Sequence, residues 1–195
     1  HPDGRHYDVQ IGNLRLENCA IVFSTSASEA LTADKLEMSR TAAGHFEIKG
    51  HSPLGAMVMT VSEATLGDEK GVQLSLEVDL EKDCRWLEIS PLSGCGISGA
   101  THLLSHGITM SGSTLMPLTP QTPASDFSSH FQCVATFGDT FLHLSHPLMQ
   151  KHASHISGRV DGRNITEMKA VTRIEFPDPG KHCAEPLTLV CARDG

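Results

Sequence analysis

Aromatic residues are scarce in this chain of 195 residues. There is one Trp, one Tyr and seven Phe, so that aromatics make up 5% of the sequence. Sandwich domains that bind sugars unaided present flat aromatic rings to the sugar, and this chain has few rings to present. The scarcity counts against a self-sufficient lectin. Trp86 is the candidate for a sugar contact, although a lone Trp lies more often in a core or an interface.

Long apolar runs are lacking too, because no stretch approaches the roughly 20 apolar residues that a bilayer-spanning helix needs. The formal net charge is −8 and the isoelectric point about 5.8. An acidic surface repels phosphate backbones. We therefore expect neither a membrane nor a nucleic acid as a partner.

The sequence lacks an initiator Met and any signal-peptide pattern at its start. A strand-like segment at residues 187–192 ends three residues before the last one. We expect a fragment of a longer protein. Its six cysteines are few for this length, and several lie in apolar contexts, which favours reduced thiols and a cytoplasmic origin. No cofactor is expected.

Strict alternation of apolar and polar residues is the clearest structural signal. It runs from Val72 to Leu80, and a shorter alternation at residues 57–61 precedes it, so the two segments predict a β-hairpin. Further hairpins are predicted around Gly12-Asn13, Gly138-Asp139 and residues 161–163.

More than ten short strands and at most one or two short helices predict an all-β fold. We expect one domain over residues 1–195, a large antiparallel two-sheet β-sandwich. A short helix is predicted at residues 28–38. The strand at residues 85–89 is expected to end at Pro91.

Residues 94–99 match the pattern G-x-G-x-x-G. Dinucleotide binding also requires a following helix and an acid about 20 residues further on. The next acid is Asp126 and the intervening segment is too short for a crossover helix. A flexible Gly-rich loop is the preferred interpretation.

Four of the twelve histidines, His143, His146, His152 and His155, fall within thirteen residues. An i, i+3 pair shares a face on a helix and could bind zinc, but on a strand its members point to opposite faces. Residues 140–145 have the pattern of a strand. We expect solvated loop histidines, with a metal site as an alternative.

Catalytic patterns are unspecific. No G-x-S-x-G motif occurs, and the carboxylates between Asp79 and Glu88 lie on or beside predicted strands, where solvated positions are common. No residue is assigned a catalytic role, and this chain alone is not expected to be an enzyme.

The central stretch, residues 103–120, is rich in Gly, Ser and Pro and is predicted to be irregular. With the strands placed, its surroundings resemble the N-terminal β-supersandwich domain of the melibiase-like α-galactosidases of glycoside hydrolase family 36. That family has an Asn-Gly start, a Trp-Gln-Ser-Trp-Ser core and a short Val/Leu-Pro-Leu strand. The corresponding segments here are 105–118, the run Ser125-Asp126-Phe127, and a closing strand after Glu185-Pro186. Ile108 and Met110 stand where the family has Trp.

The resemblance implies a non-catalytic domain that packs on a (β/α)₈ barrel absent from this chain, with the carboxylates of a retaining glycosidase on that barrel. The implied partners are a carbohydrate, reached through the parent enzyme, the barrel itself and, in a homo-oligomer, another subunit. The candidate residues for a substrate or interface loop are His106, Gly107, Ile108, Thr109, Met110 and Ser111.

A domain cut from its partner leaves an apolar patch, and we expect it near Leu103, Ile108, Met110 and Met116. Two other functions remain open: a free-standing carbohydrate-binding or adhesion sandwich with an exposed Trp86 or Tyr7, and a metal-binding protein built on the histidine cluster.

Overall fold

The computed structural model describes residues 3–26, 29–106 and 113–193, and these ranges contain strands and no helix. None of the described elements is therefore a helix long and apolar enough to cross a bilayer. The seventeen strands are β1 (His6–Ile11), β2 (Leu14–Ser26), β3 (Glu29–Thr32), β4 (Asp34–Ala42), β5 (His45–Ser52), β6 (Gly55–Leu66), β7 (Glu69–Leu80), β8 (Trp86–Ser98), β9 (His102–His106), β10 (Ser113–Pro117), β11 (Ser125–Ser129), β12 (Gln132–Phe137), β13 (Thr140–Ser145), β14 (Ala153–Asp161), β15 (Asn164–Glu175), β16 (Gly180–Cys183) and β17 (Leu187–Arg193).

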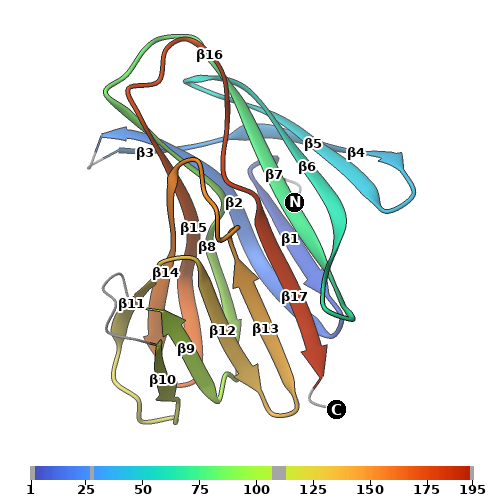
Figure 1. Cartoon of the computed structure of the whole chain (residues 1–195), viewed down its shortest axis with the longest axis vertical. Coiled ribbons are helices and arrows are strands. Elements are labelled where there is room, and N and C mark those ends of the chain that lie inside the picture. The colour runs from blue at the N-terminus through green and yellow to red at the C-terminus, as the bar shows by residue number, and fades with distance from the viewer. Residues whose placement is uncertain (1–2, 27–28, 107–112, 194–195) are drawn as a thin grey trace.

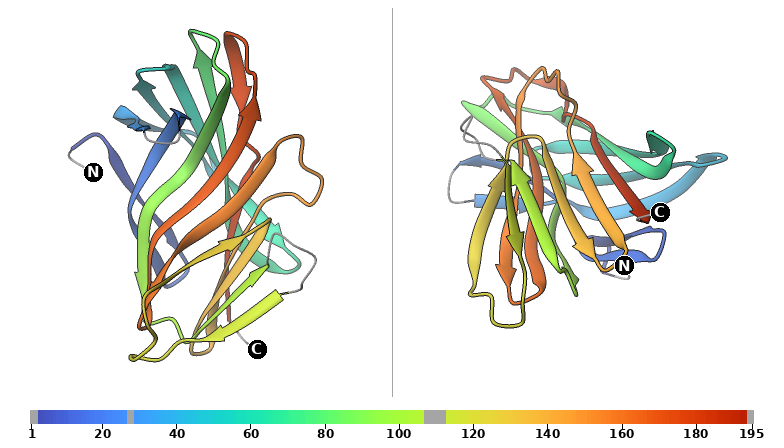
Figure 2. Two further views of the ribbon diagram at one scale, coloured as in Figure 1. Left: turned by 90° about the vertical axis from the view of Figure 1, so that its left-hand side faces the viewer. Right: turned by 60° about the horizontal axis from the view of Figure 1, so that its bottom comes forward.

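The strands form two antiparallel sheets that face each other, as Figures 1 and 2 show. The seven-stranded sheet has the order β1-β2-β8-β15-β14-β11, with β3 beside β2. The ten-stranded sheet has the order β10-β9-β12-β13-β17-β7-β6-β5-β4, with β16 beside β7. The predicted large antiparallel two-sheet sandwich is confirmed.

The core lies between the inner faces of the sheets. Strand β7 supplies Leu74, Leu76 and Val78 to it at every second position, each no more than 1% exposed, and β8 supplies Leu87 and Ile89 from the other sheet. This is the alternation read from the sequence, because a strand with one wet face must place its apolar residues two apart.

The predicted hairpins are also present. The chain turns at Gly12-Asn13 between β1 and β2, at Gly67-Asp68 between β6 and β7, and at Gly138-Asp139 between β12 and β13. Each of these glycines has a φ near +60°, the left-handed conformation that tight hairpin turns require. The hairpin of β14 and β15 turns within residues 161–164, as predicted.

The helix predicted at residues 28–38 is wrong. The described part of this segment forms β3 and the start of β4. Ala33 between them is fully buried, and its N–H donates to the Ile21 carbonyl at 2.9 Å. The N–H of Leu36 donates to the Gly4 carbonyl at 2.9 Å. Pairing with distant strands has outweighed the local helix preference of the Ala, Leu and Glu residues here.

Pro91 does not end a strand, and residues 94–99 are not a Gly-rich loop. Strand β8 runs through Pro91 and continues to Ser98. The register shifts on both sides of Pro91, against β2 and against β15. A β-bulge tolerates the missing N–H of Pro, and the Tyr7 hydroxyl donates to the Pro91 carbonyl oxygen. Burial raises the pKa of Tyr7, which keeps that hydroxyl protonated.

Candidate functional site

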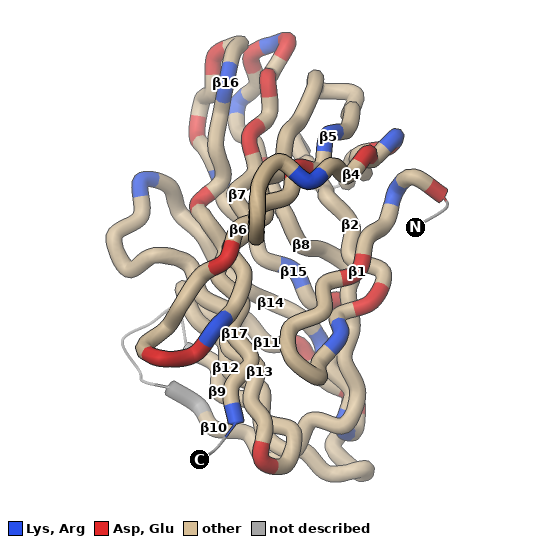
Figure 3. Tube along the Cα trace, turned by 90° about the vertical axis from the view of Figure 1, so that its right-hand side faces the viewer, with Lys and Arg blue, Asp and Glu red and all other residues tan. Residues whose placement is uncertain are grey.

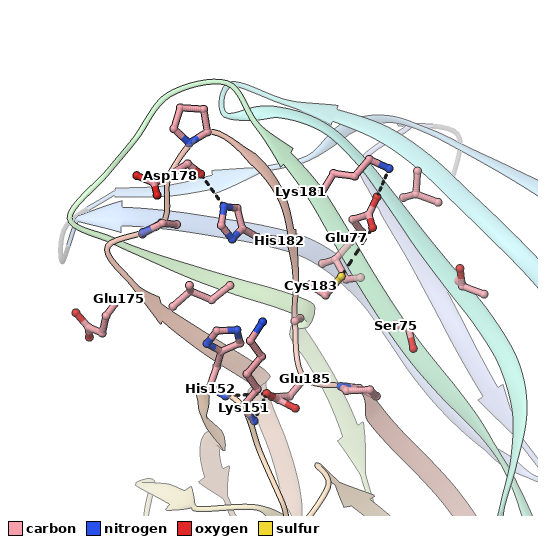
Figure 4. A pocket seen from close by; sticks show the side chains of 18 of the residues that line it. Ser75, Glu77, Lys151, His152, Glu175, Asp178, Lys181, His182, Cys183 and Glu185 are labelled. Atoms are coloured by element: carbon pink, nitrogen blue, oxygen red, sulfur yellow. Dashed lines mark hydrogen bonds and ion pairs between the residues drawn. The ribbon is translucent and has the colours of Figure 1, made fainter.

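A cleft of about 850 Å³ lies at one end of the molecule, between β16, the outer face of β7 and the segments at residues 151–152 and 174–179 (Figure 4). It is lined by both polar and apolar residues. Those that carry charge or a titratable group are Glu77, Lys151, His152, Glu175, Asp178, Lys181, His182, Cys183 and Glu185.

Two of the groups that line this cleft, Lys181 and Cys183, contact Glu77. Lys181 Nζ lies 2.8 Å from Glu77 Oε1, and Cys183 Sγ lies 3.8 Å from Glu77 Oε2. Partial burial, and then the Glu77 carboxylate, raise the pKa of the Cys183 thiol. A thiol held protonated is a poor nucleophile, so this cleft does not contain an activated cysteine.

Glu185 is the buried acid of the cleft, and its carboxylate accepts hydrogen bonds from the backbone. Its Oε1 accepts the N–H groups of Lys151 at 2.7 Å and of His152 at 2.8 Å. Its own N–H donates to Thr172 Oγ1 at 2.9 Å. A carboxylate that accepts two backbone N–H groups is occupied as a structural anchor. It fixes the segment after β13 against β17 and β15.

The four clustered histidines do not converge on one point. His143 lies on β13 in the ten-stranded sheet and His155 on β14 in the seven-stranded sheet. His152 lies in the cleft and His146 is buried. In the described ranges, no group of three or more His, Cys, Asp and Glu residues could hold a metal ion.

His146 corrects the expectation of solvated histidines. Its side chain is only 4% exposed, and its Nδ1 lies 3.2 Å from the Pro186 carbonyl oxygen. Its Nε2 has no hydrogen-bond partner among the described residues. Burial lowers its pKa to about 4, so the ring is neutral at pH 7 and Nδ1 is the donor.

A second hollow, of about 500 Å³, lies on the outer face of the seven-stranded sheet and contains Trp86. It extends over β2, β8 and β15, with β3 at its rim. Besides Trp86, its polar lining residues are Ser24, Glu29, Glu88, Ser90, Ser93, Lys169 and Arg173. We call it the Trp86 hollow.

Strand register explains why these side chains meet. Arg173 of β15 is paired with Glu88 of β8, and Glu88 is paired with Ser24 of β2, so all three share the outer face. The bulge at Pro91 places both Ser90 and Ser93 in the hollow, although they are three positions apart along the strand.

Trp86 is only partly buried, and Arg173 lies over its ring with the guanidinium carbon 4.7 Å from the ring centroid. The Arg173 Nε in turn lies 2.8 Å from Glu175 Oε1. Sequence reasoning identified Trp86 and missed Arg173, because the two residues are 87 positions apart and only the pairing of β8 with β15 joins them.

The candidate loop His106–Ser111 lies for the most part outside the described residues, since residues 107–112 are not described. His106 is the last residue of β9 and is paired with Ser113 of β10. The central stretch therefore contains two short paired strands rather than being irregular throughout. Leu103 does not add to an apolar patch, because it is 1% exposed.

No protein-family model matches the chain, and no curated protein matches it in sequence. Solved structures do match. The α-galactosidase of Lactobacillus brevis aligns with 98% of this chain and 31% of its own, at 9% identity and a TM-score of 0.48. The α-galactosidase AgaA of Geobacillus stearothermophilus aligns with 93% and 31%, at 9% identity and a TM-score of 0.47.

The galactosidase domain of the α-galactosidase-sucrose kinase AgaSK aligns with 98% of this chain at 9% identity and a TM-score of 0.50. The alignment covers 32% of that chain, so this chain spans about a third of the length of the structures it matches. At this identity the likeness concerns the fold alone: the chain has the fold of a β-sandwich portion found within α-galactosidase structures.

Proposed function

We propose that this chain is a non-catalytic β-sandwich domain of an α-galactosidase-like glycoside hydrolase, and that it packs on the catalytic domain of that enzyme. One observation carries the proposal. Residues 89–150 contain only two charged residues, Asp126 and Asp139, and none of the chain's 15 Lys and Arg. The described part of this segment forms the end of β8, from residue 89 to residue 98, and the strands β9 to β13. Strands β9 to β13 are almost free of charge colour in Figure 3.

Four strands of the charge-poor segment, β9, β10, β12 and β13, form one side of the ten-stranded sheet. Strand register places Leu104, Leu115 and Val134 next to one another on β9, β10 and β12. Leu115 is 61% exposed, and Leu104 and Val134 are partly exposed. A depletion of charge with exposed aliphatic side chains is typical of the centre of a protein interface. We call Leu104, Leu115 and Val134 the uncharged face.

The position of β17 supports the same assignment. This strand is paired with β13 and runs from Leu187 to Arg193, where it lies beside Thr140 at the far end of the sheet. A domain joined through β17 would emerge on the same side of the sheet order as the uncharged face, with β13 between β17 and β12 (Figure 1). The fold shared with AgaSK over a third of its length supports the class of the partner.

The test begins with the reading frame that encodes this chain. The proposal expects it to continue into alternating strands and helices with Asp residues at strand ends. The longer protein should hydrolyse an aryl α-galactoside, whereas the 195-residue chain should not. A frame that stops at residue 195, or hydrolysis by the chain alone, would contradict the proposal.

A binding experiment tests the surface. The 195-residue chain and the downstream segment, expressed separately, should associate. Leu115→Glu combined with Val134→Glu should weaken their association at least tenfold, because each places a charge in an apolar contact. Met38→Glu, at a residue 70% exposed on β4, is the matched control. Equal binding by the double variant and by the control would show that the domains meet elsewhere.

A further inference from the structure

We infer that the Trp86 hollow binds a neutral saccharide. The hollow lies on the outer face of the seven-stranded sheet, whereas the uncharged face belongs to the ten-stranded sheet. The inference is independent of the proposed function, since a sugar could occupy this hollow whether or not the other sheet carries a catalytic domain. Its volume of about 500 Å³ is within the usual range for small-ligand sites.

The aromatic part of the site is held in place before any ligand arrives. Arg173 lies over the Trp86 ring, and Glu175 holds the Arg173 Nε at 2.8 Å. These contacts restrict the rotamers of Trp86 and Arg173, which lowers the entropic cost of binding a ligand. The partly exposed indole of Trp86 offers an apolar surface to the C–H groups of a pyranose ring, with polar groups beside it for the hydroxyls.

The polar groups suit an uncharged ligand. Two carboxylates, Glu29 and Glu88, and two cations, Lys169 and Arg173, line the hollow, so their formal charges cancel. A phosphate or a sugar acid would meet both carboxylates, and a cation would meet both basic groups. Hydroxyl groups both donate and accept, and they can bind the two kinds of charged group at once.

The floor of the hollow favours a polar occupant over an apolar peptide. Ser90 is 5% exposed and its hydroxyl donates to the Leu92 carbonyl at 2.8 Å, which leaves its oxygen able to accept a hydrogen bond. Phe23 also borders the hollow, but it is fully buried and gives no apolar surface to a ligand. The side chain of Trp86 therefore supplies the one aromatic contact within the described part of the hollow.

Trp86 is also the only tryptophan in the chain, so its fluorescence reports on this hollow without labelling. We would titrate the 195-residue chain with galactose, glucose, maltose and stachyose, and repeat each titration with glycerol, inorganic phosphate and glucuronate. The expected result is a saturable change in emission for at least one neutral saccharide, with a Kd on the order of 1 mM or tighter. Calorimetry with the same sugar should give the same Kd.

Two variants keep the Trp86 reporter and remove one polar contact each. Glu88→Gln and Lys169→Met should each weaken saccharide binding roughly tenfold, the effect of losing one charge-assisted hydrogen bond. Glu37→Gln on β4 and Lys49→Met on β5 make the same charge changes on the other sheet, and should leave the Kd unchanged. Circular dichroism would establish that all four variants keep the β-sheet fold.

Three outcomes would overturn the inference. The first is the lack of a saturable signal in both fluorescence and calorimetry for every neutral saccharide. The second is an equal response to glycerol, which indicates a solvent effect. The third is binding of phosphate or glucuronate alone, which would identify an anion site. None of these results affects the association or hydrolysis experiments on the proposed function.

Discussion

Single residues in this protein have structural roles that depend on contacts with residues far away in the sequence. Glu185 anchors the backbone at Lys151 and His152. The Nδ1 atom of His146 donates a hydrogen bond to the Pro186 carbonyl oxygen, and its Nε2 atom is buried without a hydrogen-bond partner among the described residues. Protonation of a buried ring whose second nitrogen has no partner costs free energy, because the charged form is poorly solvated.

Protonation of His146 should destabilise the fold in acid. Its pKa is about 4 in the folded protein, against the usual value of 6.5, so between these values the unfolded chain binds more protons. Stability from this residue is complete above pH 6.5 and is lost as the pH falls towards 4. The loss is on the order of 3 kcal/mol. Urea denaturation across this range measures it.

The variant His146→Gln isolates the contribution of His146 to the pH dependence of stability from that of the other histidines. Burial also lowers the pKa of His143 and His155, so the wild type loses stability for several reasons. The variant should show a shallower slope of unfolding free energy against pH. His45→Gln, at an exposed position on β5, should keep the wild-type slope. Parallel slopes for His146→Gln and the wild type would exclude the role given to His146.

Trp86 was predictable as a candidate contact because its type is rare in the sequence, and rarity is a local signal. Its partners were not predictable. Charged residues such as Arg173 on β15 and Glu88 on β8 are common on the exposed faces of strands, and only the register of β8 against β15 brings these two together. The burial of His146 was missed for a similar reason, since a polar segment was expected to be solvated.

Among the elements, prediction succeeded where a strand has one buried and one exposed face, and failed where a stretch of strand is buried on both faces or exposed on both faces. Strand β7 alternates and was recognised, as were the hairpins around their glycine turns. Strand β8 buries four consecutive residues, Ile89 to Leu92, at its bulge, so it has no period of two there. Strands β3 and β4 are short or mostly exposed and carry helix-favouring residues, so pairing alone determines their structure.

The junction between β7 and β17 leaves no room for a side chain at Gly71. A Cβ there would lie 2.1 Å from the Leu189 carbonyl oxygen and 2.8 Å from Val190 Cγ2. Gly71→Ala must push the two strands apart. We expect it to lower the free energy of unfolding by about 2 to 4 kcal/mol, measured by urea denaturation.

Gly67→Ala provides the comparison, because Gly67 has a φ of +61° and nothing within 4 Å of the added carbon. It should cost only the left-handed backbone strain, about 1 kcal/mol. If Gly71→Ala cost no more than Gly67→Ala, the close approach of β17 to β7 would be refuted.

At the scale of the whole molecule, all six cysteines are free thiols and differ in their access to solvent. Cys183 is exposed, whereas Cys19, Cys95 and Cys133 are no more than 1% exposed. Burial raises the pKa of Cys133 to about 12. It therefore lowers both the fraction of thiolate and the access of a reagent to the sulfur.

A thiol reagent should therefore distinguish these residues. In the native protein it should modify Cys183, more slowly than a free thiol of ordinary pKa, while the three buried cysteines react only after unfolding. All six should react in denaturant without prior reduction. Fewer than six reactive thiols in the unreduced, unfolded chain would indicate a disulfide. Rapid native modification of Cys133 would mean that the sandwich opens.

The place of β17 has a consequence for how the protein is made. This strand stands between β13 and β7 and joins the two halves of the ten-stranded sheet, although it is the last strand of the chain. During synthesis the two groups of strands on either side of β17, which are β4 to β7 and β9, β10, β12 and β13, emerge first. Each group then has an open edge at the place that β17 will fill. The sheet closes only after residues 187–193 have left the ribosome. Until then the nascent chain exposes unpaired edges to its neighbours, and we expect chaperone binding to be strongest in that interval.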